Sequence, residues 1–104
     1  MKLILAIVQN DDAKQLIKAL TEQGFSVTRL TTTGGFLQGG NVTLLIGVAP
    51  DRLQAALDII RERSGLRKEY TVIPSSAELI DMPVQVTLGG ATVFVVDVEA
   101  HYKF

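Results

Sequence analysis

The chain has 104 residues, 47% of them hydrophobic, and its 10 Lys and Arg against 11 Asp and Glu leave a formal net charge of −1. This length predicts one domain over residues 1–104, and the balanced charge disfavours nucleic acids and anionic membranes as partners, because both are bound by basic surfaces. Cysteine is absent, which excludes disulfides, thiolate nucleophiles and thiolate metal sites.

The first part of the chain predicts a strand, a helix and a second strand. Leu3–Val8 is a continuous apolar run, which is typical of a central strand. A helix is expected to begin within Gln9–Asp12, where carboxylates are favoured by the helix dipole, and to end at Gly24. The alternating segment Phe25–Leu30 predicts a strand with one buried face. Because the N-terminus lacks the features of a signal peptide and no apolar run reaches membrane-spanning length, we expect a cytoplasmic protein.

The middle of the chain predicts another strand and another helix. Val42–Val48 is apolar at its centre and indicates a strand. Pro50 suits the first turn of a helix, and Gly65 is expected to end that helix. The segment Arg67–Pro83 has no clear periodicity, and we expect a mobile loop there with a short strand at Glu69–Ile73.

The end of the chain predicts a hairpin, in which Val84–Leu88 and Ala91–Val98 flank the turn Gly89–Gly90. The whole order is therefore β-α-β-β-α-β with an appended hairpin, the pattern of a ferredoxin-like α+β sandwich. Two helices can cover only one face of such a sheet, although its strands are apolar on both. We therefore expect a homo-oligomer that buries the second face.

A glycine-rich segment, Thr31–Asn41, lies between the second and third predicted strands. Its four glycines allow the backbone to approach a ligand closely, and Phe36 offers a flat face on which a ring can stack. The alternative is a hairpin turn with Phe36 packed into the core.

Two blocks of sequence, Thr33–Leu37 and Gly89–Val95, together with the opening Met1–Gln9, resemble the PII-like cyclic-di-AMP receptor family. The similarity extends over nearly the whole chain. It implies a trimer of ferredoxin-like subunits that holds one cyclic dinucleotide at each of three clefts between subunits. The positions that match the family's pocket are Thr28, Gly35, Phe36, Leu37, Asn41 and Gly47.

The chemistry of these positions fits an adenine ring. Phe36 and Leu37 can enclose its faces, and the Asn41 amide can pair with its edge. Thr28 offers a hydroxyl to a base or a phosphate, and Gly47 lets a ligand pass close to a strand. The alternatives are a strand surface residue at Thr28, a turn residue at Asn41 and a β-bulge at Gly47.

Three positions depart from the family's pattern. Ser26 and Gln38 stand where arginine is common, and Lys103 stands where glutamine is usual. The loss of two arginines weakens binding of an anion by several kcal/mol, since charge-assisted hydrogen bonds contribute roughly 1.5–3 kcal/mol each. Lys103 is expected to restore part of this loss as a further ligand contact.

The resemblance implies a non-catalytic signalling protein without cofactor or metal, which passes its signal to a partner protein through Arg67–Pro83. ATP or ADP is the alternative ligand. An acylphosphatase-like enzyme is the catalytic alternative, but the acidic segment Gln9–Asp12 after the first strand would repel phosphate. His101 has no nucleophile placed beside it by a motif, and we expect it to be a terminal packing residue.

Overall fold

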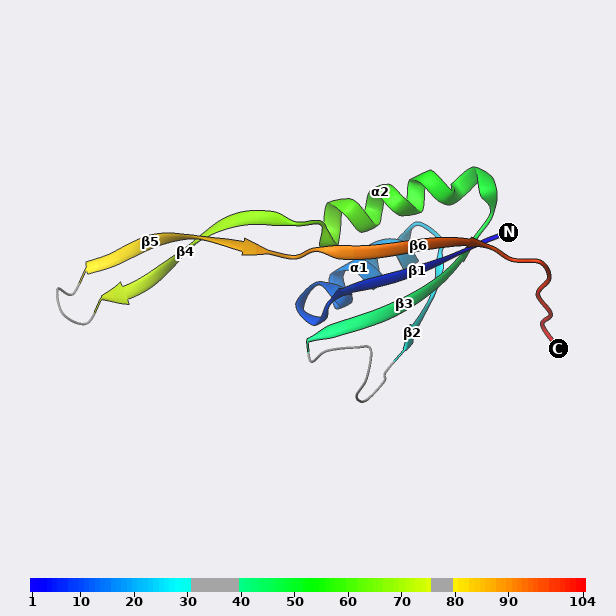
Figure 1. The fold of residues 1–104 in the computed structure, drawn as a ribbon, viewed down its shortest axis with the longest axis horizontal. Coiled ribbons are helices and arrows are strands. Elements are labelled where there is room, and N and C mark those ends of the chain that lie inside the picture. The colour runs from blue at the N-terminus through cyan, green and yellow to red at the C-terminus, as the bar shows by residue number, and fades with distance from the viewer. Residues whose placement is uncertain (31–39, 76–79) are drawn as a thin grey trace.

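A four-stranded antiparallel sheet and a separate two-stranded arm make up the fold (Figure 1). The structure is a computed structural model that describes residues 1–30, 40–75 and 80–104. The elements are β1 (Lys2–Gln9), α1 (Asn10–Glu22), β2 (Ser26–Leu30), β3 (Asn41–Val48), the short 3-10 helix η1 (Pro50–Arg52), α2 (Leu53–Ser64), β4 (Arg67–Ser75), β5 (Ile80–Leu88) and β6 (Ala91–Asp97). The predicted α+β class is confirmed.

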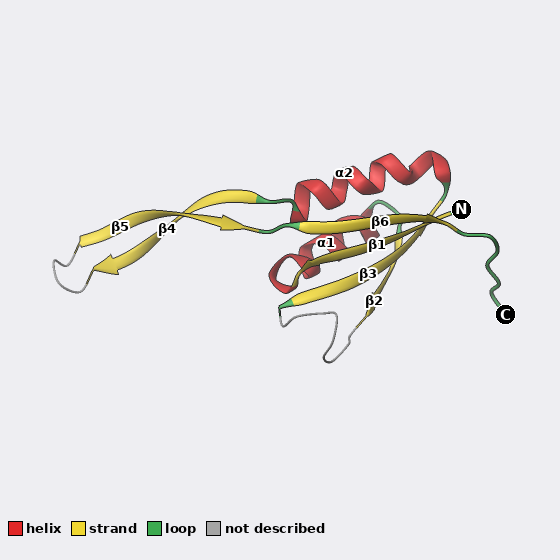
Figure 2. Ribbon diagram, viewed as in Figure 1, coloured by secondary structure: helices red, strands yellow, loops and turns green. Residues whose placement is uncertain are grey.

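The sheet has the strand order β2-β3-β1-β6, which is consistent with a ferredoxin-like sandwich. β1 lies at its centre and pairs with β3 on one side and with β6 on the other. Both helices pack on one side of this sheet (Figure 2). The core between the two layers contains apolar residues from the sheet and from both helices. Fully buried examples are Ile4, Ala6, Leu44, Ile46, Leu16, Leu20 and Ile60.

Local sequence explains how α1 begins and ends. Its first turn carries Asp11 and Asp12, which are favoured by the helix dipole. At the other end, Gly24 takes a left-handed φ of 86°, and the amides of Gly24 and Phe25 donate to the carbonyls of Thr21 and Leu20. This pattern is a Schellman cap, and it confirms the predicted stop at Gly24.

Gly65 ends α2, as predicted, but by another mechanism. Its φ is −67°, so it is not the left-handed cap that the sequence suggested. A Cβ at this position would lie 2.4 Å from the carbonyl oxygen of Arg61, and therefore only glycine fits where the chain leaves the helix.

The segment Arg67–Pro83 is not the irregular loop that the sequence predicted. Its described residues, 67–75 and 80–83, belong to β4 and β5, which pair with each other antiparallel from Arg67↔Leu88 to Ser75↔Ile80. The short strand predicted at Glu69–Ile73 is confirmed as part of β4. The prediction failed because this segment lacks the one-sided apolar alternation of a strand packed on a core. The two strands form a separate sheet that extends away from the helices (Figure 1).

The predicted appended hairpin is also wrong. Val84–Leu88 lies within β5 and pairs with β4, whereas β6 pairs with β1 as the fourth strand of the main sheet. Gly89–Gly90 therefore links two sheets and is not a hairpin turn. The extra hairpin is inserted between α2 and β6, and it gives the molecule principal extents of 63 × 31 × 19 Å.

Candidate functional site

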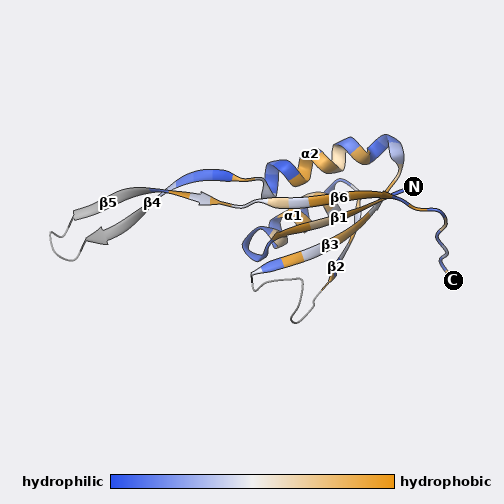
Figure 3. Cartoon of the chain, in the orientation of Figure 1, coloured by the Kyte–Doolittle hydropathy of each residue, from blue (hydrophilic) through white to orange (hydrophobic). Residues whose placement is uncertain are grey.

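The face of the main sheet that the helices leave open carries apolar side chains from three strands. Cross-strand pairs place Leu5 between Leu45 and Phe94, and Leu3 between Gly47 and Val96. Phe94 is 50% exposed and Val96 is 44% exposed. Figure 3 shows the hydrophobic character of β1, β3 and β6. We call this surface, made of Leu3, Leu5, Ile7, Leu45, Phe94 and Val96, the open face.

Two of the predicted ligand contacts, Thr28 and Gly47, lie on the open face. Thr28 pairs with Leu45, and Gly47 pairs with Ser26 of the same edge strand, β2. The bulge alternative for Gly47 is wrong, because the register of β3 is continuous on both of its sides. A Cβ at Gly47 would only touch the Met1 side chain, at 3.5 Å. The fold of a single chain therefore does not itself require glycine there.

Asn41 and Lys103 lie far from each other. Asn41 is the first residue of β3, and Gly47 lies six residue steps further along the extended strand, roughly 20 Å away. Lys103 is exposed in the segment after β6, at the end of the sheet where both termini lie (Figure 1). The predicted contacts Gly35, Phe36 and Leu37 fall outside the described residues.

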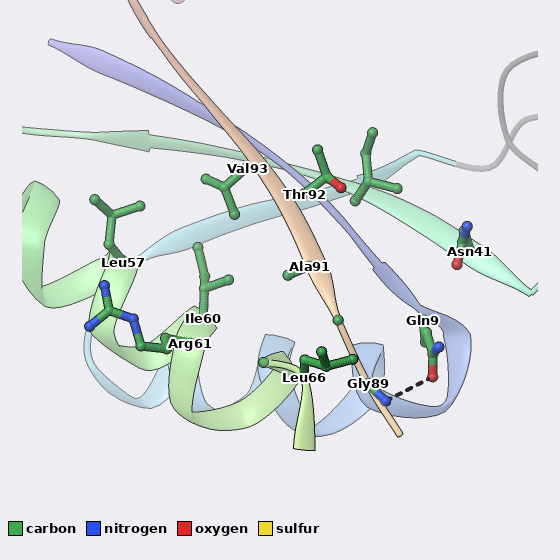
Figure 4. A pocket seen from close by; sticks show the side chains of 13 residues that line it. Gln9, Asn41, Leu57, Ile60, Arg61, Leu66, Gly89, Ala91, Thr92 and Val93 are labelled. Carbon is green, nitrogen blue, oxygen red and sulfur yellow. Dashed lines mark hydrogen bonds between the residues drawn. The ribbon is translucent and has the colours of Figure 1, made fainter. Parts of the chain in front are cut away.

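A cleft of about 640 Å³ lies at the Asn41 end of the sheet. Its apolar wall comes from the last turns of α2, from Leu66 and from the start of β6 (Figure 4). Its polar side chains are the Gln9 and Asn41 amides, the Thr92 hydroxyl and the Arg61 guanidinium. A smaller hollow of about 300 Å³ adjoins it and is lined in part by the same two amides. This combination of an apolar wall with a few polar groups is typical of a small-molecule site.

The cleft also includes Gly89 and Gly90, which the sequence pattern predicted to be a turn. Both take a positive φ, 80° and 110°. Gly89 is buried, and a Cβ there would lie 2.5 Å from both the Arg67 Nη1 and the Gly65 carbonyl oxygen. Glycine is required at Gly89 because of this close packing. The signal in the sequence that could have indicated this place is the Gly-Gly pair itself, which resembles the two Gly-Gly pairs of the glycine-rich segment.

An ion pair joins the two-stranded arm to α1 next to the cleft. Arg67, the first residue of β4, places its Nη2 2.8 Å from the Asp12 Oδ1, and its Nε is 3.1 Å from the Glu69 Oε1. Asp12 is buried and Arg67 is partly exposed. The hydrogen bond with Asp12, followed by that with Glu69, raises the pKa of Arg67 above its usual value. The guanidinium therefore stays charged at any physiological pH.

Within the described residues, no group of three or more His, Cys, Asp and Glu side chains is arranged to hold a metal ion. Neither α1 nor α2 is long and apolar enough to cross a membrane. β1 passes directly into α1.

Comparisons with known proteins give matches that extend over nearly the whole chain. A family model described as cyclic-di-AMP receptor matches residues 1–104. The crystal structure of a functionally unknown protein from Pediococcus pentosaceus ATCC 25745 is similar, with 40% sequence identity and a TM-score of 0.80. That match covers 99% of this chain and 96% of the other.

Proposed function

Because this chain belongs to the cyclic-di-AMP receptor family, we propose that it is a non-catalytic sensor that binds cyclic-di-AMP between the subunits of a homotrimer. The observation that carries the proposal is the open face, an apolar surface that holds Thr28 and Gly47 and that the chain's own helices do not cover. A cytoplasmic location belongs to the same proposal, since a soluble nucleotide messenger would meet the protein there.

Burial of the open face supports an oligomer, and the resemblance to the receptor family is what implies that the oligomer is a trimer. Leu5, Leu45 and Phe94 lie side by side across three strands, and burying apolar surface contributes about 25 cal/mol per Å². A contiguous apolar patch of this kind marks an interface. Two more copies of the chain would cover it and would bring their own β3 strands toward the first.

The ligand site is proposed to combine residues of neighbouring subunits. Thr28 and Gly47 would contact one part of the ligand on the open face, and Gly47 would let the ligand approach the β3 backbone. Asn41, which lies one strand length away, would contact a base through its amide, together with Gly35, Phe36 and Leu37. Lys103 would supply a positive charge for the phosphates of the ligand.

The β4–β5 arm is proposed to relay binding to a partner protein. It joins the main body at two places that border the cleft: Arg67, which is held by Asp12, and Gly89–Gly90. A ligand that changes the position of these residues would change the direction of the arm. The strands of the arm form a sheet of their own, so they would present free edges to a partner.

Light scattering and isothermal titration calorimetry would test this function. We expect a trimer mass at micromolar concentration and binding of cyclic-di-AMP in preference to ATP and ADP. A stable monomer would contradict the intersubunit site. Binding of ATP alone would favour the alternative ligand, and turnover of an acyl phosphate would favour the acylphosphatase alternative.

The variant Phe36→Ala would test the stacking role of the glycine-rich segment. Its affinity for cyclic-di-AMP should fall by about 1–3 kcal/mol, the usual contribution of a base stacked on an aromatic ring. Tyr70→Ala is a control, because it removes an exposed aromatic ring in β4, which is not among the proposed ligand contacts. Equal affinity of Phe36→Ala and wild type would return Phe36 to the core-packing alternative.

A further inference from the structure

Gln9 is the residue directly opposite Asn41 in the main sheet. It ends β1, Asn41 begins β3, and the two are cross-strand partners in the antiparallel register. Side chains of such a pair lie on the same face, with their Cβ atoms about 4.5–5.5 Å apart. Both amides line the cleft of about 640 Å³ and the smaller hollow beside it. A ligand that contacts Asn41 within this cleft would therefore have Gln9 as a neighbour.

The orientation of the Gln9 amide follows from its contact with Gly89. The Gly89 backbone N–H donates to the Gln9 Oε1 at 3.3 Å (Figure 4). Gly89 is buried, and a buried N–H needs an acceptor. Only the oxygen of a glutamine amide can accept, so the Nε2 must occupy the other position. Gln9 thus presents N–H donors beside Asn41.

The Gly89 peptide that holds Gln9 is itself fixed in place. The Arg67 guanidinium and the Gly65 carbonyl oxygen pack so closely on Gly89 that no Cβ fits. The next amide, that of Gly90, donates to the Ser64 carbonyl at 2.9 Å. Gln9 also leaves the N-terminus of α1 uncapped by its side chain, which is engaged with Gly89 instead. The bond to Gly89 therefore favours one orientation of the exposed Gln9 amide, which lowers the cost of binding.

We propose that Gln9 is a specificity-determining residue of the nucleotide cleft, whose Nε2 donates a hydrogen bond to an acceptor atom of the ligand beside Asn41. The acceptor is a ring nitrogen of the base or a phosphate oxygen, since both lack a hydrogen and both match a donor. This inference rests on the proposed function. It adds a contact that selects for acceptor atoms of the ligand, because the Nε2 can only donate a hydrogen bond.

The variant Gln9→Glu distinguishes the proposed contact with the ligand from the structural hydrogen bond to Gly89. One carboxylate oxygen can still accept the Gly89 N–H, whereas the donor that faces the ligand becomes an anionic acceptor. We expect calorimetry to show an affinity for cyclic-di-AMP lower by about tenfold or more. The melting temperature should stay within about 2 °C of wild type, because the Gly89 bond is kept.

Asn10→Asp is the matched control, because it adds the same charge one residue further along. The Asn10 Oδ1 accepts from the Arg29 Nη2 at 2.9 Å, a bond that aspartate retains. Asn10 borders the smaller hollow but does not line the larger cleft in which the contact is proposed. Equal loss of affinity in the two variants would mean that the added negative charge only repels the anionic ligand, and this result would overturn the proposal. So would unchanged affinity in Gln9→Glu.

Uncharged adenosine, titrated into the same variants, distinguishes the two acceptors. Weaker binding of adenosine to Gln9→Glu than to Asn10→Asp would assign the contact to the base. A selective loss in Gln9→Glu that appears only with cyclic-di-AMP would assign it to a phosphate. If wild-type protein binds neither compound, the proposed function fails, a result distinct from failure of the Gln9 contact alone.

Discussion

The two faces of the main sheet have similar side chains but different surroundings. On β3, Leu44 faces the helices and is fully buried, whereas its neighbour Leu45 lies on the open face and is only half-buried. Strand residues alternate between faces, so both environments come from one short segment. The comparison shows that the helices bury one face within the chain and leave the other face uncovered, and we propose that neighbouring subunits cover it.

The largest expected effect comes from truncating the helix-covered face. Leu44→Ala should lower the free energy of unfolding by about 2–5 kcal/mol, because it leaves a cavity in a packed core. Denaturant unfolding at two protein concentrations would measure this loss of stability, and the loss should be the same at both concentrations. Leu45→Ala is the matched variant on the open face. Its loss of stability should increase with protein concentration, because the open faces become buried as the subunits assemble. A concentration-independent cost for Leu45→Ala would show that this face is not an interface.

A charge on the open face should prevent assembly without unfolding the chain. Phe94→Glu replaces a half-exposed ring, opposite Leu5, with a carboxylate that would be expensive to bury. Light scattering should show a monomer, and circular dichroism should remain that of the folded protein. Lys18→Glu, on the exposed side of α1, should leave the mass unchanged. A trimer mass for Phe94→Glu would place the interface elsewhere.

The attachment of the arm should depend on one ion pair. Arg67→Met removes the hydrogen bonds to Asp12, and hydrogen bonds to charged groups contribute about 1.5–3 kcal/mol. Hydrogen exchange should become faster in β4 and β5, since an isolated two-stranded sheet is only marginally stable, and should be unchanged in β1. Lys68→Met removes a neighbouring charge and should have no such effect. Equal exchange in Arg67→Met and wild type would mean that the arm is held by other contacts.

The smallest effect concerns an exposed ion pair at the termini. Lys2 donates to Asp97, and this hydrogen bond lowers the pKa of Asp97. The folded chain therefore releases the proton more readily than the unfolded chain, and the pair stabilises the fold above the ordinary pKa of aspartate. This contribution should be lost as the pH falls through the lowered pKa. Melting temperatures followed from pH 7 downward should decline slightly less in Asp97→Asn than in wild type.

The sequence alone determined the elements that depend on local pattern. The periodicity of Ala13, Leu16 and Leu20 with a glycine stop predicted α1, and apolar runs predicted β1 and β3. The same apolar runs, read against only two helices, predicted an uncovered sheet face. Family resemblance placed candidate ligand contacts at Thr28, Asn41 and Gly47. Their contact with a ligand stays a prediction.

Only the tertiary structure decided which strands pair and which distant residues meet. The Gly89–Gly90 pair reads locally as a hairpin turn, yet β5 pairs with β4 and β6 with β1, because strand partners are chosen by packing over the whole sheet. The contact of Gln9 with Gly89 joins residues 80 positions apart, and no spacing in the sequence indicates it. A local pattern records which face of an element is apolar, whereas the hydrogen-bond partner of a buried amide depends on the complete fold.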